Sequence, residues 1–182
     1  MKKISVISII ASTLIMASPY EASSTVEEID NTFVLSLPTS FALLGGVMQG
    51  DGSDMWEQVL GVEFSFKCLM SDDIRSQLQF TQYDDDTITM LQLSMNPHYI
   101  FNRGEDMEFG IGPSFGIAQV ELGDEKDTIY TYGLGASLRV DYDNNFFIGT
   151  EARYEWTKDI ELGTKQGNLN NAKILAKVGF WF

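Results

Sequence analysis

In the last eleven residues, 172–182, every second residue is apolar, and the residues between them include two lysines. A β-strand points successive side chains to opposite faces, so one face of this stretch is entirely apolar, while the other carries Lys173 and Lys177. Two structures fit such a strand. In a soluble sheet the apolar face packs on a core, whereas in a transmembrane barrel it faces lipid and the lysines face a polar lumen. The pattern of the remaining sequence decides which of these two structures the strand belongs to.

Residues 1–24 predict a secretory signal peptide. Lys2 and Lys3 precede an uncharged apolar run, and small residues follow as far as Ser24. The run is too short to cross a bilayer as a helix. Cleavage after Ala22 or after Ser24 fits the small-residue rule, and we prefer Ser24 because Tyr20 lies three positions back in the first case.

The formal net charge of the chain is −14. This balance argues against nucleic acid as a partner, because phosphates require a basic surface. The single cysteine, Cys68, cannot form an intramolecular disulfide, so an exported chain needs another source of stability, such as a closed barrel. Beyond the signal no apolar run approaches the length of about 20 residues that a membrane helix requires. A membrane-spanning form would therefore use strands.

From Thr32 onward the sequence is a series of alternating segments of about ten residues, separated by Gly, Asp and Asn clusters. The segments are approximately 32–47, 57–69, 74–83, 91–101, 107–121, 130–142, 146–156 and 172–182. This pattern predicts one all-β domain over residues 32–182, a transmembrane antiparallel up-and-down β-barrel of about eight strands. Residues 25–31 are acidic and aperiodic, and we expect a short periplasmic leader there.

The polar faces of the fifth and sixth segments are rich in glycine, at Gly110, Gly112, Gly116, Gly133 and Gly135. On a solvent-exposed strand, glycine is less stable than alanine by about 0.5–1 kcal/mol and brings no evident benefit. In a narrow closed barrel it leaves room for side chains from the opposite wall. The glycines therefore favour an inward-facing polar side.

Charged residues on the polar faces are nearly balanced in sign, although the whole chain is strongly acidic. They are Glu63, Lys67, Arg75, Glu108, Arg139, Asp141, Glu151, Arg153, Glu155, Lys173 and Lys177. Because an unpaired buried charge costs several kcal/mol, this set predicts a charge-paired network in the lumen. The alternative is that these are solvated surface charges.

Aromatic residues are found toward the ends of the apolar faces, with smaller aliphatic residues between them. They are Tyr130, Tyr142, Phe146, Tyr154, Trp156, Phe180 and Phe182. This placement is typical of interface girdles around a lipid-facing band. Pro38, Pro97 and Pro113 argue against regular strands, so each is expected at a bulge, a strand end or a wrongly placed boundary.

Four motifs carry a family resemblance. They are the terminal Val-Gly-Phe-Trp-Phe at 178–182, the run Tyr-Gly-Leu-Gly-Ala-Ser-Leu-Arg at 132–139, the turn at 143–145 leading into 146–154, and the glycine-rich run 109–116. With these motifs the chain resembles the small eight-stranded outer-membrane β-barrel family, which includes OmpX-like, OmpA-like and opacity-type porin-family barrels.

The resemblance implies a location in the outer membrane of a Gram-negative-type bacterium, with outer-membrane lipids as surroundings. It implies that Phe180 and Phe182 belong to the signal that the outer-membrane assembly machinery recognises. It also implies that the N terminus and the turns near Ser71, Asn102 and Asp143 are periplasmic. The connections near residues 51, 84, 124 and 163 would then lie outside the cell.

No catalytic residue, cofactor site or metal site is predicted. His98 is the only histidine, which rules out a multi-histidine metal site. It shares a face with Ser94 and points into the lumen, the wrong side for attack on a lipid ester. The acidic stretches 84–86 and 121–127 could hold Ca²⁺ or Mg²⁺, but solvated loops are the preferred interpretation.

The sequence therefore predicts a structural or surface-interaction protein that is not an enzyme. We expect a filled lumen rather than an open pore, and acidic extracellular loops through which a ligand could be bound. Two alternatives remain: a lipid-modifying enzyme on the same barrel, and a secreted, lipocalin-like soluble carrier.

Overall fold

A computed structural model describes residues 40–51, 54–68, 71–84, 88–102, 104–123, 125–142, 145–158, 160–162 and 165–182. The strands are β1 (Ser40–Gly50), β2 (Glu57–Cys68), β3 (Ser71–Asp84), β4 (Ile88–Ile100), β5 (Met107–Leu122), β6 (Glu125–Tyr142), β7 (Phe146–Thr157), β8 (Ile160–Leu162), β9 (Lys165–Gly167) and β10 (Asn171–Trp181). The expected signal peptide, the leader, Pro38 and the first residues of the expected barrel domain lie outside the described residues.

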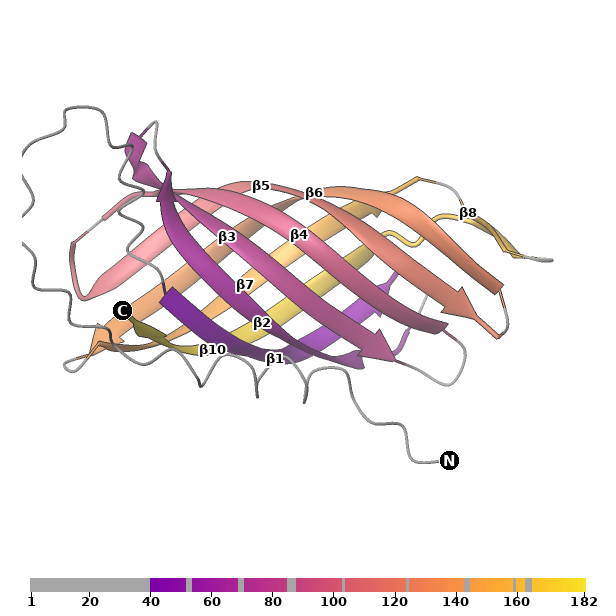
Figure 1. Ribbon diagram of the computed structural model, residues 1–182, viewed down its shortest axis with the longest axis horizontal. Helices are drawn as coiled ribbons and strands as arrows, with labels where there is room; N and C mark the ends of the chain where they lie inside the picture. Colours follow the sequence, from indigo (N-terminus) through magenta and orange to yellow (C-terminus); the bar gives the residue numbers. More distant parts are fainter. Residues whose placement is uncertain are drawn as a thin grey trace, which may run out of the picture. The chain divides into compact units, whose positions relative to one another are not determined.

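Eight of these strands close into a barrel in the order β1-β10-β7-β6-β5-β4-β3-β2, as Figure 1 shows. Every neighbouring pair is antiparallel, including β1 with β10, which joins the two ends of the sheet. The predicted all-β, eight-stranded up-and-down barrel is therefore confirmed. The connection after β7, which the sequence left without strands, contains the hairpin of β8 and β9. Within the described residues, no helix is long and apolar enough to cross a membrane.

The two ends of the barrel differ in which connections they carry. We call the end at which β10 finishes, together with the β4–β5 and β6–β7 connections, the turn end (Figure 1). The opposite end, where β1, β3, β5 and β7 finish, is the loop end. Gly123 and Asn145 have φ values of 63° and 62° in two of the connections, a left-handed conformation that glycine and asparagine tolerate.

Exposure alternates along the strands with the period of two that the sequence predicts. Leu134 is 58 % exposed and Phe115 is 56 % exposed, although both are large apolar side chains. Glu151 and Glu155, by contrast, are 1 % and 0 % exposed. The apolar residues thus cover the outside of the barrel, and carboxylates and ammonium groups fill much of its inside.

Pro97 and Pro113 lie directly across from each other in the middle of β4 and β5. Met95 pairs with Phe115 and Tyr99 with Ile111 in one register, and the ladder is interrupted between these pairs. The two missing N–H donors therefore fall at one place in one ladder. For Pro97 and Pro113 this corrects the expectation that each proline lies at a bulge, a strand end or a wrongly placed boundary. The register shift of this sheet lies elsewhere, between Lys67 and Cys68.

Aromatic side chains gather near both ends of the outer surface. At the loop end Tyr132 stacks on Trp156 with ring centroids 5.7 Å apart, and at the turn end Phe146 packs against Tyr142 and Phe180. Ten residues separate Tyr132 from Tyr142 along β6, about 34 Å of strand and about 26 Å along the axis at a tilt of about 40°. This separation matches the height of about 25 Å of the apolar band of membrane barrels.

Candidate functional site

Six charged side chains inside the barrel form one continuous chain of alternating sign, which we call the central chain. In order of contact its members are Glu63, Lys177, Glu151, Arg153, Glu155 and Lys173. The Lys177–Glu63 pair is 2.5 Å apart and the Lys173–Glu155 pair 2.7 Å. All six side chains are at least nine-tenths buried. Each internal member contacts two ions of opposite sign, which offsets the cost of removing it from water.

Neutral amides connect the central chain to the far wall of the barrel. Gln79 on β3 donates hydrogen bonds to Glu63, at 2.7 Å, and to Glu151, at 3.0 Å. Because β3 and β7 lie four strands apart in either direction around the barrel, the Gln79–Glu151 bond spans opposite walls. Gln92 on β4 likewise accepts a hydrogen bond from Lys173 on β10, again the opposite strand. The side chains thus meet across the lumen.

A second group of charges lies nearer the turn end and contains Arg75, Glu108, Arg139 and Asp141. Glu108 contacts both arginines, and Arg139 also lies 2.8 Å from Asp141. The guanidinium of Arg139 stacks 4.2 Å from the ring of Trp181, whose Nε1 donates to Asp141 at 3.1 Å. Cation–π stacking and hydrogen bonding therefore hold this terminal tryptophan inside the barrel.

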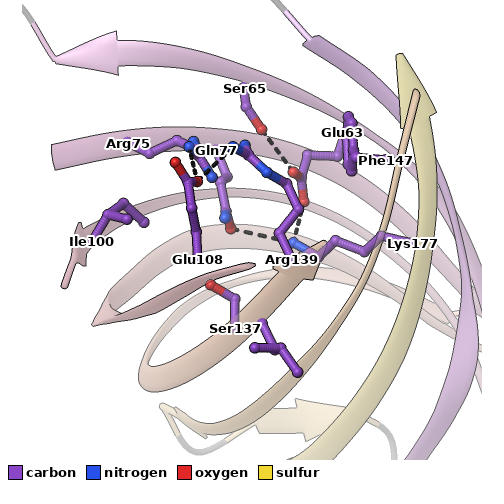
Figure 2. A pocket seen from close by; sticks show the side chains of 11 residues that line it. Glu63, Ser65, Arg75, Gln77, Ile100, Glu108, Ser137, Arg139, Phe147 and Lys177 are labelled. Atoms are coloured by element: carbon purple, nitrogen blue, oxygen red, sulfur yellow. Dashed lines mark hydrogen bonds and ion pairs between the residues drawn. The ribbon is translucent and has the colours of Figure 1, made fainter. Parts of the chain in front are cut away.

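Figure 2 shows the space between the two groups, where Arg75, Arg139 and Lys177 converge on Glu63 and Glu108. The cavity that these residues line has a volume of about 20 Å³. A cavity of this size has room for about one water molecule.

Ten of the eleven charged residues predicted for the lumen are buried or half-buried on the inner face of the barrel. They comprise five acids and five bases, so the set is formally neutral. Lys67 is exposed near the end of β2, although it pairs with the inward-facing Arg75 and so lies on the same face, at the rim of the barrel. Alternation therefore predicts the face of Lys67 but not its exposure, which follows from its place at the end of the strand, and its part in the lumen network stays a prediction.

His98 and Ser94 point inward, as their positions on β4 predict. His98 is fully buried, and its Nδ1 lies 2.8 Å from the hydroxyl of Ser137. Its Nε2 has no hydrogen-bond partner among the described residues, and a Cβ on Gly135 would lie 3.4 Å from it. The glycine thus leaves room for the imidazole, as the glycine-rich polar face suggested.

The interior at the loop end is apolar, which sequence reasoning missed. The cluster there consists of Leu44, Met48, Val59, Met90, Ala118, Val120, Ile129 and Leu175. Each member lies on the inner face of its strand and is at most 6 % exposed. The apolar residues at these inner-face positions, such as Leu175 between Lys173 and Lys177, were the available signal.

Acidic residues near the loop end form local pairs. Asp84 accepts a hydrogen bond of 2.7 Å from Thr89, and Glu121 pairs with Lys126 at 2.5 Å. Residues 85–87 and 124 lie outside the described part of the chain. Among the described residues, no group of three or more His, Cys, Asp or Glu side chains could hold a metal ion.

The comparisons with known proteins identify the fold. No model of a known protein family matches the chain, and no curated protein matches it by sequence. The barrel is similar to the crystal structure of Neisserial surface protein A, with a TM-score of 0.57 and 14 % identity over 79 % of this chain and 96 % of that one. It is also similar to the N-terminal β-barrel domain of Pseudomonas aeruginosa OprF, with a TM-score of 0.53 and 16 % identity over 81 % of this chain and 100 % of that one. The chain thus has the fold of the small eight-stranded outer-membrane β-barrels.

Proposed function

We propose that this protein is an integral outer-membrane barrel of a Gram-negative-type bacterium with a structural or surface-interaction role. One observation carries the proposal: the barrel exposes its large apolar side chains, such as Leu134 and Phe115, while it buries Glu151 and Glu155. In water this arrangement would leave an apolar surface far larger than the few hundred Å² usual for a soluble protein. In a membrane the exposed apolar side chains contact lipid, and the carboxylates lie in the polar interior of the barrel.

The paired charges inside the barrel act structurally in this proposal and close it to solutes. The support is that Gln79 and Glu151 meet from opposite walls and that the cavity near Arg75 has room for about one water. A lumen filled in this way is typical of eight-stranded barrels.

Assembly into the membrane depends, in this proposal, on recognition of the terminal strand by the outer-membrane assembly machinery. The support is that Phe180 and Phe182 are 52 % and 79 % exposed on the outer face. Both rings are therefore accessible at the C-terminal strand of the chain.

The loop end faces the exterior in this proposal, and its acidic connections contact extracellular partners. Asp51, Asp54 and Glu125 are exposed at this end. A lipid-modifying activity lacks support, because the only histidine in the sequence, His98, is buried inside the barrel.

The test of location is fractionation of cells that express the full chain, with and without boiling before electrophoresis. The proposal predicts that the protein is found in the outer-membrane fraction and that the unboiled barrel migrates differently from the boiled chain. Recovery in the soluble fraction would support the secreted carrier instead.

The test of orientation is labelling of intact cells with a membrane-impermeant maleimide in a Cys68→Ser background. Asp54→Cys at the loop end should react, whereas Glu105→Cys at the turn end should react only after lysis. Both native side chains are exposed, so the two positions are matched in accessibility. The opposite labelling pattern would invert the proposed orientation.

A further inference from the structure

A pocket of about 200 Å³ lies at the loop end, next to the apolar cluster of the interior. Met48 and Met90 line the pocket and also belong to the cluster. Tyr83, Ile88 and Leu169 line it as well and pack against the same cluster. The middle of the barrel is filled with paired ions, whereas this pocket at its mouth has a largely apolar lining. No residue of the central chain lines it, so the pocket is separate from the ionic network.

Among the described residues that line the pocket, one polar group lacks a hydrogen-bond partner. Asn171 is 1 % exposed, and its Nδ2 donates to the carbonyl of Leu169 at 2.9 Å. Its Oδ1 has no hydrogen-bond partner among the described residues. A buried carbonyl oxygen without a partner is costly, so a ligand that brings an O–H or N–H group would gain a hydrogen bond that the described residues do not make.

The charge of the lining limits which ligands fit. Among the described residues that line the pocket, Asp51 is the only carboxylate, and none is a lysine, an arginine or a histidine. Asp51 is exposed, at the end of β1. An anionic ligand would therefore be repelled, whereas a neutral or cationic one would not.

We propose that this pocket binds a small neutral or cationic amphiphile, with one ring or a short alkyl chain and a single hydroxyl or ammonium donor. The size agrees, because an apolar cavity of about 150 Å³ is large enough for benzene. The apolar body would pack on Met48 and Met90, and the donor would bond to Oδ1 of Asn171. This binding role goes beyond the structural role proposed above and is independent of the orientation of the barrel.

The direct test is NMR of the full chain in lipid nanodiscs, with ¹³C-labelled methionine methyl groups and 2-phenylethanol as the probe. Met48 and Met90 should shift saturably. Met95 and Met107, which are 40 % and 51 % exposed on the outer face, should not. Unchanged Met48 and Met90 signals would overturn the proposal, as would non-saturating shifts of equal size at all four methyl groups, since those report partition into lipid.

A pair of matched variants distinguishes pocket binding from non-specific effects. A Cβ on Gly50, which lines the pocket, would meet no atom within 4 Å, so Gly50→Leu can fill the pocket without a backbone clash. Gly45→Leu is the control, because its Cβ would face the outer side chain of Leu60 at 3.9 Å. Gly50→Leu should weaken binding at least tenfold and Gly45→Leu less than twofold. Both variants should show the electrophoretic migration of a folded, unboiled barrel. If they do and yet bind the probe with equal affinity, the probe does not bind in this pocket.

The donor and the charge are tested with three further probes. The wild type should bind 2-phenylethanol about two- to tenfold more tightly than ethylbenzene, and Asn171→Leu should abolish this preference. The wild type should also bind 2-phenylethylamine more tightly than 3-phenylpropanoate. A preference for the alcohol that survives in Asn171→Leu, or tighter binding of the anion, would show that the pocket does not recognise ligands as proposed.

Discussion

Gln79 on β3 donates a 3.0 Å hydrogen bond to Glu151 on β7, the strand diametrically opposite it in the barrel. Both residues are at most 1 % exposed. A bond between opposite walls exists only where the lumen is narrow enough for two side chains to fill it. The two walls are thus joined through the interior as well as through the backbone ladders.

The first prediction concerns the coupling between these two residues. In a double-mutant cycle of Gln79→Leu and Glu151→Gln, the free energies of unfolding in lipid should deviate from additivity by about 1 kcal/mol, because Gln79→Leu removes the donor and Glu151→Gln removes the charge of the acceptor, so the charge-assisted part of the hydrogen bond is lost only once. Gln119→Leu with Glu151→Gln is the control, since Gln119 is exposed on β5. Additivity in both cycles would show that the cross-lumen contact contributes nothing.

The second prediction concerns the centre of the ionic chain. Arg153→Met leaves Glu151 and Glu155 without their shared cation, and the free energy of unfolding should fall by about 3–5 kcal/mol. Lys158→Met removes an exposed cation just beyond β7 and should change stability by less than about 0.5 kcal/mol. Urea titration of folded protein in lipid vesicles measures both. Equal effects of the two substitutions would mean that the buried charges are not paired as described.

Inward and outward faces were predictable from the sequence, because alternation has a period of two and most segments carry one clearly apolar face. The partners of each charge were not predictable, because the stagger between strands decides which side chains reach the same depth. Gln79, an uncharged residue, bridges the lumen, whereas Lys67, which has the expected charge, is exposed. The apolar cluster was missed because β1 is apolar on both faces, so alternation does not mark Leu44 and Met48 as interior.

The third prediction concerns the close approach of β4 and β5 beside the paired prolines. A Cβ at Gly112 would overlap the carbonyl oxygen of Pro97, which is backbone and cannot rotate away. Gly112→Ala should therefore lower the free energy of unfolding by roughly 1–3 kcal/mol. Gly45→Ala, whose Cβ would make an ordinary contact at 3.9 Å, should be neutral or slightly stabilising. Unfolding titrations that rank the two variants in the reverse order would contradict the register of these strands.

The fourth prediction concerns assembly. Replacing Phe180 and Phe182 by alanine should lower the amount of heat-modifiable barrel in the outer membrane several-fold, because the terminal strand then lacks the aromatic residues proposed for recognition. Phe101→Ala is the matched control, since Phe101 is 59 % exposed at the same end of the barrel but lies far from the C terminus in sequence. A loss of the same size in the control would indicate a general need for aromatic rings at the interface.

The central claim is that the apolar face meets lipid and the ionic face does not, and the three tryptophans allow a direct measurement. Two single-tryptophan proteins, retaining either Trp156 or Trp181 with the other two replaced by phenylalanine, are reconstituted in vesicles of lipids brominated along the acyl chains. Trp156 stacks on Tyr132 at the outer surface, whereas Trp181 lies inside against Arg139. Bromine should quench the fluorescence of Trp156 strongly and that of Trp181 weakly. Strong quenching of Trp181 with Trp156 unaffected would contradict the account.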